Sequence, residues 1–323
     1  MKREYLKQLN LTELYRKYGI VCVLILLFIT ASLLNENFTN PQNLVNILLQ
    51  ITPIAIIAAA QTMLIVSGNI DLSAGAVAGL SASLSAGALV ATGSLPISIV
   101  VGMGSGAAFS FLSGTLVTVF KLPPFIATLA MMNVARGLVI IYTGGVTIRG
   151  LEPIRWLGQG RLFGVIPNLI ILMVIVLIIV QIVMKKTKFG LYMYSIGGNK
   201  AASTAAGINV NRQIRLTYLF SGSLIGLAGI TLNARMMAAH PGVGPGYEFD
   251  AITATIVGGT SFLGGVGSMY CVMTGAVIIG IINNLMILMG VDTSWQMVVK
   301  GFLIALAVAL DIFTKRSRQN TLG

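Results

Sequence analysis

The chain has 323 residues, of which 56% are hydrophobic and only 9% are charged, with a mean hydropathy of +0.90. Soluble domains average about 25% charged residues, so this composition excludes a water-soluble fold and predicts an all-α polytopic membrane protein. The net charge of +12 does not indicate a nucleic-acid-binding protein, because the lysines and arginines lie at the ends of apolar segments and form no basic patch with interleaved aromatics.

Ten apolar segments approach the roughly 20 residues that a helix needs to cross a bilayer. The eighth is short and rich in glycine and threonine, so it is a candidate half-helix or re-entrant element. We expect a polar N-terminal segment (1–18), one transmembrane domain (19–313) and a polar tail (314–323). The ten segments cover approximately residues 19–34, 48–66, 72–92, 95–119, 124–143, 164–184, 216–234, 250–264, 267–289 and 295–313.

The basic residues predict the orientation of these segments. If the N-terminus is cytosolic and the chain crosses ten times, 15 of the 21 lysines and arginines lie in cytosolic segments. Two lie within spans, Arg136 and Lys300, and four lie in outer segments: Arg149, Arg155, Arg161 and Arg235. Cytosolic loops carry the excess of basic residues in membrane proteins, so we expect both termini in the cytosol.

The longest polar stretch, residues 185–215, joins the sixth and seventh segments and is cytosolic in this orientation. Within it, the sequence from Asn199 to Ala206 predicts a short helix that Gly207 ends, because glycine readily adopts the left-handed conformation after a helix. Its residues are mostly small. A small-residue helix between two spans favours docking against a partner protein.

An internal repeat predicts two related halves. Residues 60–68 (AQTMLIVSG) resemble residues 251–259 (AITATIVGG), and each stretch is followed by a turn and another glycine, Gly75 or Gly265. Paired apolar segments interrupted by glycine, at corresponding positions of two halves, are typical of a transport pathway between the halves.

Polar residues within the apolar segments are candidates for a substrate pathway, since polar groups at membrane depth are costly and usually functional. Each has a structural alternative. Asp71 or Ser73 can cap the third segment, and the predicted position of Asp71 at the cytosolic end favours this capping role. Arg136 shares a helix face with Asn133 and can pair with a carboxylate, the favoured interpretation. Amides can bond across helices. The pathway candidates are Gln61, Asp71, Asn133, Arg136, Asn283 and Asn284.

The sequence predicts no catalytic site and no metal site. The single histidine, His240, lies in a loop rich in glycine and proline without a second ligand nearby, and Cys22 and Cys271 lie inside apolar segments. No phosphate-binding loop of the form G-x-x-x-x-G-K-[ST] occurs in the chain. We therefore expect that it does not hydrolyse ATP by itself and is not an enzyme.

From about Asn37 to Asp311 the chain resembles the integral-membrane permeases of bacterial sugar ABC importers of the ribose, xylose, arabinose and galactoside type. The stretches that carry the resemblance, in order, are NFTNPQNLVNILLQ, SGNIDLSAGAVAGLSA, PPFIATLAMMNVARGL, GGNKAASTAAGINV, GYEFDAITATIVGGTSFLGGVGS and INNLMILMGVDTSWQMVVKG. The ribose permeases are the most similar. Related members transport other pentoses, hexoses, inositol or autoinducer-2.

The resemblance implies a multi-pass permease of the bacterial plasma (inner) membrane, working as a homodimer or heterodimer. It implies two partner ABC ATPase subunits that hold Mg-ATP, and an extracytoplasmic sugar-binding protein. Loop 185–215 then couples to the ATPase through Gly197, Gly198, Asn199, Lys200, Ala201, Ala202, Gly207 and Ile208. Importers of this kind often carry Glu where this chain has Lys200, which implies a more acidic ATPase surface. The binding protein would dock on outer loops carrying Arg149, Arg155, Arg161, Arg235 and Glu248.

The expected function is import of a monosaccharide, ribose or a related pentose or hexose, by alternating access driven by the partner ATPase. One alternative is import of autoinducer-2, inositol or another small polyol by the same mechanism. A second is an ATP-independent secondary transporter or facilitator, but Asp71 and Asp250 lie too close to segment ends to resemble paired intramembrane ion sites. A membrane subunit with a purely structural role is the remaining alternative.

Overall fold

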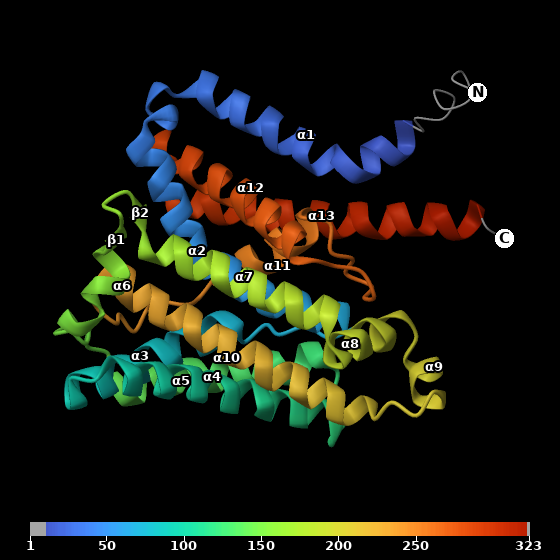
Figure 1. Cartoon of the computed structure of the whole chain (residues 1–323), viewed down its shortest axis with the longest axis horizontal. Coiled ribbons are helices and arrows are strands. Elements are labelled where there is room, and N and C mark those ends of the chain that lie inside the picture. The colour runs from blue at the N-terminus through green and yellow to red at the C-terminus, as the bar shows by residue number, and fades with distance from the viewer. Residues whose placement is uncertain (1–10, 322–323) are drawn as a thin grey trace.

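The computed structural model describes residues 11–321 and is built almost entirely of helices (Figure 1). Each of the ten predicted segments overlaps a helix, although several bounds differ. These ten helices are α1 (Leu11–Leu34), α2 (Pro41–Val66), α3 (Ala74–Thr92), α4 (Leu95–Thr118), α5 (Pro124–Thr143), α7 (Asn168–Lys186), α10 (Val210–Met236), α11 (Tyr247–Val257), α12 (Met269–Leu288) and α13 (Thr293–Thr321).

Shorter elements lie at the ends of the bundle. They are η1 (Glu36–Thr39), η2 (Glu152–Ile154), α6 (Arg155–Gln159), β1 (Arg161–Leu162), β2 (Ile166–Pro167), α8 (Lys188–Gly198) and α9 (Lys200–Ala205). β1 pairs antiparallel with β2, so that Arg161 lies opposite Pro167. Figure 1 shows α6, β1 and β2 at one end of the bundle, and α8 and α9 at the other. The Leu11 end of α1 and the Thr321 end of α13 lie on the α8–α9 side.

Within the part of the chain that the structure describes, seven helices are long and apolar enough to cross a membrane: α2, α3, α4, α5, α7, α10 and α12. Shorter apolar stretches lie in α1 (19–34) and α13 (293–309). The predicted eighth segment, 250–264, has the length of the half-helix that its composition suggested, because α11 has 11 residues and stops at Val257. At 1.5 Å per residue α11 is about 16 Å long, half of what a full crossing needs. The rest of that segment is a turn with Gly259 and Gly264 at positive φ, and Gly265, the next residue, is at positive φ too.

Several helices begin earlier in the chain than the apolar segments predicted from the sequence. α2 starts at Pro41, where the Asn40 side chain accepts a hydrogen bond from the Gln42 N–H. α10 starts at Val210, where Asn209 accepts from the Arg212 N–H. In both cases the capping asparagine lies upstream in polar sequence, so the helix includes a polar first turn that hydropathy does not detect.

The core lies around α2 and α10. Every residue of α2 from Ile51 to Val66 is buried. α10 packs against α4 through glycines: a Cβ added at Gly106 would lie 2.3 Å from the Gly222 carbonyl oxygen, and one at Gly226 would lie 2.2 Å from that of Gly102. Small residues allow this close approach of two backbones, which is the usual packing of membrane helices.

Candidate functional site

The helix predicted within residues 185–215 is present as α9, Lys200–Ala205. The Asn199 Oδ1 accepts a hydrogen bond from the Ala202 N–H at 2.9 Å, and Gly207 has a φ of +82°, so the two ends form as the sequence indicated. The preceding α8 is capped by Thr187, whose side chain accepts from the Gly190 N–H. Lys200, Ala201 and Ala202 are exposed, so α9 presents a small-residue face at the end of the bundle.

The α8 end of this segment is held tightly against the bundle. Gly197 lies against the Val66 carbonyl oxygen so closely that an added Cβ would be 1.8 Å from it. The Tyr194 hydroxyl donates to the Gly267 carbonyl oxygen at 2.6 Å, and the Gly265 N–H donates to the Val66 carbonyl oxygen at 3.0 Å. The turn that follows α11, residues 258–268, therefore joins α8 to the end of α2. We call it the α11 turn.

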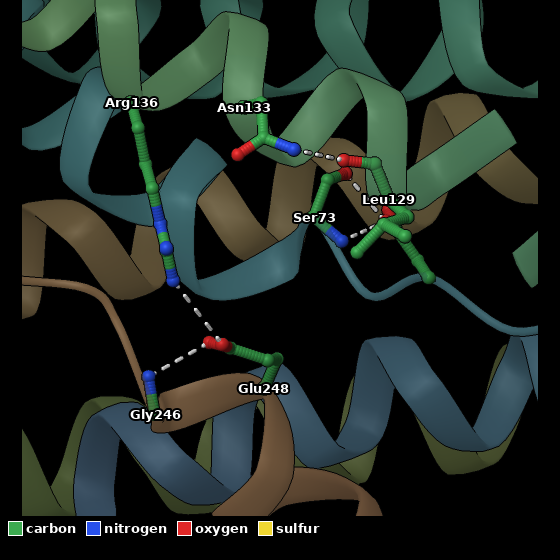
Figure 2. A network of polar contacts seen from close by, with 7 residues as sticks. Ser73, Leu129, Asn133, Arg136, Gly246 and Glu248 are labelled. Atoms are coloured by element: carbon green, nitrogen blue, oxygen red, sulfur yellow. Dashed lines mark hydrogen bonds and ion pairs between the residues drawn. The ribbon is translucent and has the colours of Figure 1, made fainter. Parts of the chain in front are cut away.

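Two carboxylates in the first turn of α11 pair with basic residues from different helices. Asp250 accepts from the Lys300 ammonium group of α13 at 2.8 Å. The Glu248 Oε1 lies 3.9 Å from the Arg136 Nη2 of α5, while its Oε2 accepts from the Gly246 N–H at 3.1 Å (Figure 2). Among the described residues, Oε1 has no hydrogen-bond partner. The structure thus confirms that Arg136 pairs with a carboxylate.

The burial of Glu248 corrects its assignment to an exposed docking surface. Its side chain is 0% exposed and lies beside Gly75, where an added Cβ would be 1.9 Å from Oε2. The loop before α11 packs along the first turns of α3, and this packing encloses the carboxylate. By contrast, Arg149, Arg155, Arg161 and Arg235 are all exposed. Arg155 and Arg161 belong to α6 and β1, at the end of the bundle opposite α9 (Figure 1).

Gln61 and Asp71 contact each other inside the bundle, and both are fully buried. The Gln61 amide bonds to the backbone N–H and carbonyl oxygen of Asp71. The Asp71 carboxylate accepts from the Ser73 N–H at 2.8 Å and from the Ser110 hydroxyl at 3.4 Å. Asp71 therefore holds the turn before α3 through the backbone N–H of Ser73, the N-cap residue, and Ser73 makes no side-chain capping bond of its own.

The remaining pathway candidates lie in three different places. Asn284 is buried and forms two reciprocal 2.9 Å hydrogen bonds with Asn43 of α2. Its amide therefore bonds across helices, the structural role given above as the alternative to a place in the pathway. Asn283 is partly buried beside Asp250 and Lys300, with which it lines a small cavity. Asn133 and Arg136, three residues apart on α5, are both exposed. The Asn133 amide donates to the Leu129 carbonyl oxygen one turn earlier.

Helix α13 has two attachments that were not predicted from the sequence. Besides Lys300, Asp311 accepts from the Phe262 N–H at 2.9 Å and the Ser261 hydroxyl at 3.2 Å, so α13 is joined to both α11 and the α11 turn. Lys300 and Asp311 are charged residues within an apolar helix, and such residues usually pair. That signal indicated partners, although it did not identify them.

Comparison with known proteins identifies the family. Residues 43–308 match the family model described as branched-chain amino acid transport system / permease component. The ribose import permease of Bacillus subtilis is 40% identical over 96% of this chain and 98% of its own length. That of Escherichia coli is 37% identical over 92% and 94%. The fructose import permease of Rhizobium meliloti is 33% identical over 88% and 81%.

No solved structure matches this chain. The family match covers most of the residues, and the relatives align along nearly their whole lengths. The functions of these relatives as import permeases agree with the helical, membrane-spanning architecture described above. The chain therefore belongs to the bacterial membrane permease family that includes the permeases of ABC sugar importers.

Proposed function

We propose that this chain is the membrane-spanning subunit of an ATP-binding-cassette importer that moves a monosaccharide, ribose or a related pentose or hexose, into the cytosol. A partner ATPase drives the transport by alternating access. The observation that carries the proposal is the exposed helix α9, fixed through α8 and the α11 turn to the centre of the bundle. The relatives named as ribose and fructose permeases support the substrate class.

In this proposal the ATPase, when it closes on Mg-ATP, moves α9 and α8. The contacts of Gly197 with Val66 and of Tyr194 with Gly267 pass that movement to α2 and the α11 turn. Because these contacts involve backbone atoms in close approach, a displacement of α8 cannot be absorbed by side-chain rotation alone. α11 then moves relative to α5, and the Arg136–Glu248 contact changes.

The substrate path runs along the exposed face of α5, at the interface with a second permease subunit. Asn133 and Arg136 supply donors there, with the Glu248 carboxylate behind them. Sugar hydroxyls both donate and accept hydrogen bonds, so a cation, a carboxylate and an amide complement them. Gln61, Asp71 and Asn284 are left out of the path, since their polar groups hold helices together. Asn283 lies away from α5, beside α13.

The extracytoplasmic sugar-binding protein docks at the opposite end, where Arg149, Arg155, Arg161 and Arg235 are exposed. Charges at the rim of an interface mainly set orientation and the association rate. The surface of the partner is therefore expected to be acidic, and docking to weaken as salt concentration rises.

Reconstitution tests the proposal. Permease, ATPase and binding protein are placed in proteoliposomes, and uptake of labelled ribose is measured with and without ATP. ATP-dependent uptake that requires the binding protein supports the importer. Uptake without ATP indicates a facilitator, and a binding protein that selects inositol or autoinducer-2 indicates the polyol alternative.

A double variant tests the coupling role of α9. Ala202→Trp with Gly207→Trp should abolish substrate-stimulated ATP turnover and leave membrane insertion intact. A matched control at the opposite end is Ala91→Trp with Gly93→Trp, where the alanine is exposed and the glycine follows α3 at a φ of +63°. Normal turnover in the α9 variant would contradict the coupling role.

A further inference from the structure

A hollow of about 320 Å³ opens between α8 and the beginning of α10. Its lining includes no residue of α9 and neither partner of the Arg136–Glu248 contact, and it shares Ile208 with the predicted coupling residues. Residues from both helices and the loop between them line it: Phe189, Tyr192, Ile208, Asn209, Arg212, Gln213 and Leu216. Two of these lining residues connect the helices, because the buried Gln213 amide of α10 donates a hydrogen bond to the Phe189 carbonyl oxygen of α8 at 3.0 Å.

The surroundings of the hollow carry positive charge without compensation. Residues 185–215 include six lysines and arginines and no acidic residue. Arg212, in the wall of the hollow, is exposed. Among the residues whose side chains the structure describes, the two salt bridges are those of Glu248 and Asp250, and no carboxylate pairs with Arg212. The hollow therefore suits an anionic ligand.

One stripe along α10 changes from polar to apolar at this hollow. Asn209 and Arg212 lie at its start, and Leu216 and Leu219 follow at helical spacing with about a third of their surface exposed (36% and 37%). Ile179 and Ile182, on the last turns of α7 before α8, are exposed as well. Exposed leucine and isoleucine side chains on membrane-spanning helices face acyl chains, so the boundary between Arg212 and Leu216 lies at headgroup depth.

We propose that this hollow binds one anionic phospholipid, with its phosphate beside Arg212 and an acyl chain along Leu216 and Leu219. Tyr192 fits the same position, since tyrosine is enriched where a membrane meets water. Basic pockets between membrane helices bind anionic headgroups in this way. A lipid is favoured over an acidic protein segment because the hollow continues into an apolar exposed surface. The proposal does not depend on which substrate is transported.

The test uses the purified permease without its ATPase, in mild detergent. Phosphatidylglycerol or phosphatidylcholine is added, and retained lipid is counted by native mass spectrometry. We expect one phosphatidylglycerol to be retained preferentially. Arg212→Gln should weaken that retention about fivefold, the effect of one basic residue near an anionic surface. Leu216→Ser should weaken it as well, and soluble glycerol phosphate should not compete.

The matched control is Lys200→Gln, which removes the same charge from the same segment at a distance from the hollow wall. Each variant is first shown to elute and melt like the unmodified protein. Equal loss of retained phosphatidylglycerol in Lys200→Gln and Arg212→Gln would show a diffuse effect of charge and would contradict a specific lipid site. Unchanged retention of phosphatidylglycerol in Arg212→Gln would overturn the site as well.

Discussion

The two carboxylates at the start of α11 face opposite neighbours and are held very differently. Asp250 makes a 2.8 Å hydrogen-bonded pair with Lys300 of α13. Glu248 stands 3.9 Å from Arg136 of α5, too far for a hydrogen bond. Both pairs join α11 to another helix. Arg136 is 43% exposed whereas Glu248 is 0% exposed, so the second pair lies at the edge of an open face.

This difference indicates where α11 is able to move. On the α13 side it is fixed by Lys300, and its turn is fixed by Asp311 and Tyr194. On the α5 side one long ion pair remains. A half-length helix with firm attachments on one side and a loose one on the other is suited to carry motion toward α5. Four predictions test this contrast.

The largest expected effect comes from breaking the tight pair. Lys300→Met leaves Asp250 without its cation in apolar surroundings, and we expect a loss on the order of 3 kcal/mol. Thermal unfolding in detergent measures it. The double variant Lys300→Met with Asp250→Leu should recover most of the stability, because no unpaired charge then remains. Equal losses in the single and double variants would contradict a tight pair.

Gly75→Ala should disturb the enclosure of Glu248. The added Cβ would meet Glu248 Oε2 at 1.9 Å and the Gly244 carbonyl oxygen at 2.3 Å. We expect a loss of roughly 1–3 kcal/mol from overpacking and a fall in transport. The matched control is Gly137→Ala on α5, where nothing lies within 4 Å of the added Cβ. That change should stabilise the helix by roughly 0.5–1 kcal/mol. If Gly75→Ala left both stability and transport unchanged, the loop before α11 would pack less closely on α3 than the structure shows.

Tyr194→Phe should remove one attachment of the α11 turn. The hydroxyl bond to Gly267 is lost, whereas the contact of the Lys185 ammonium group with the ring face at 4.3 Å is kept. We expect about 1 kcal/mol of destabilisation and weaker substrate stimulation of the ATPase. Tyr192→Phe, on the same helix, is the control. If both variants stimulate normally, the α11 turn does not transmit motion from α8.

The smallest stability effect should come from the loose pair. Glu248→Gln and Arg136→Gln should each cost only about 0.5–1 kcal/mol, since the pair is long and its cation is half-exposed. Both should nevertheless reduce sugar uptake in proteoliposomes, because the pair lies on the proposed path. Full uptake by both variants would show that the α5 face is not part of the substrate path. A loss of stability as large as that of Lys300→Met would show that the two ion pairs are held equally tightly.

Local features of the fold were predictable because neighbouring residues produce them. The apolar segments, the Asn199 cap, the Gly207 end of α9 and the role of Asp71 in its turn all depend on residues within a few positions. Hydropathy also indicated that the eighth segment was exceptional. It did not give the true starts of α2 and α10, which depend on polar caps outside the apolar residues.

The placement of Glu248 was wrong for a different reason. In sequence it follows a loop of glycine and proline and resembles a surface residue, so it was assigned to docking. Its burial results from the packing of that loop on Gly75 and Gly79, far away in the chain. Likewise, Asn283 and Asn284 are adjacent in sequence, yet one pairs with Asn43 and the other faces Asp250 and Lys300.

Composition and short-range hydrogen bonding are enough to specify a helical membrane protein, the segments where its basic residues gather, and the position of helix α9. Only the tertiary structure decided which charges meet: Arg136 with Glu248, Lys300 with Asp250, and Asp311 with the α11 turn. A charge in an apolar segment must find a partner, but helix packing selects that partner. The same packing sets how tightly each pair is held.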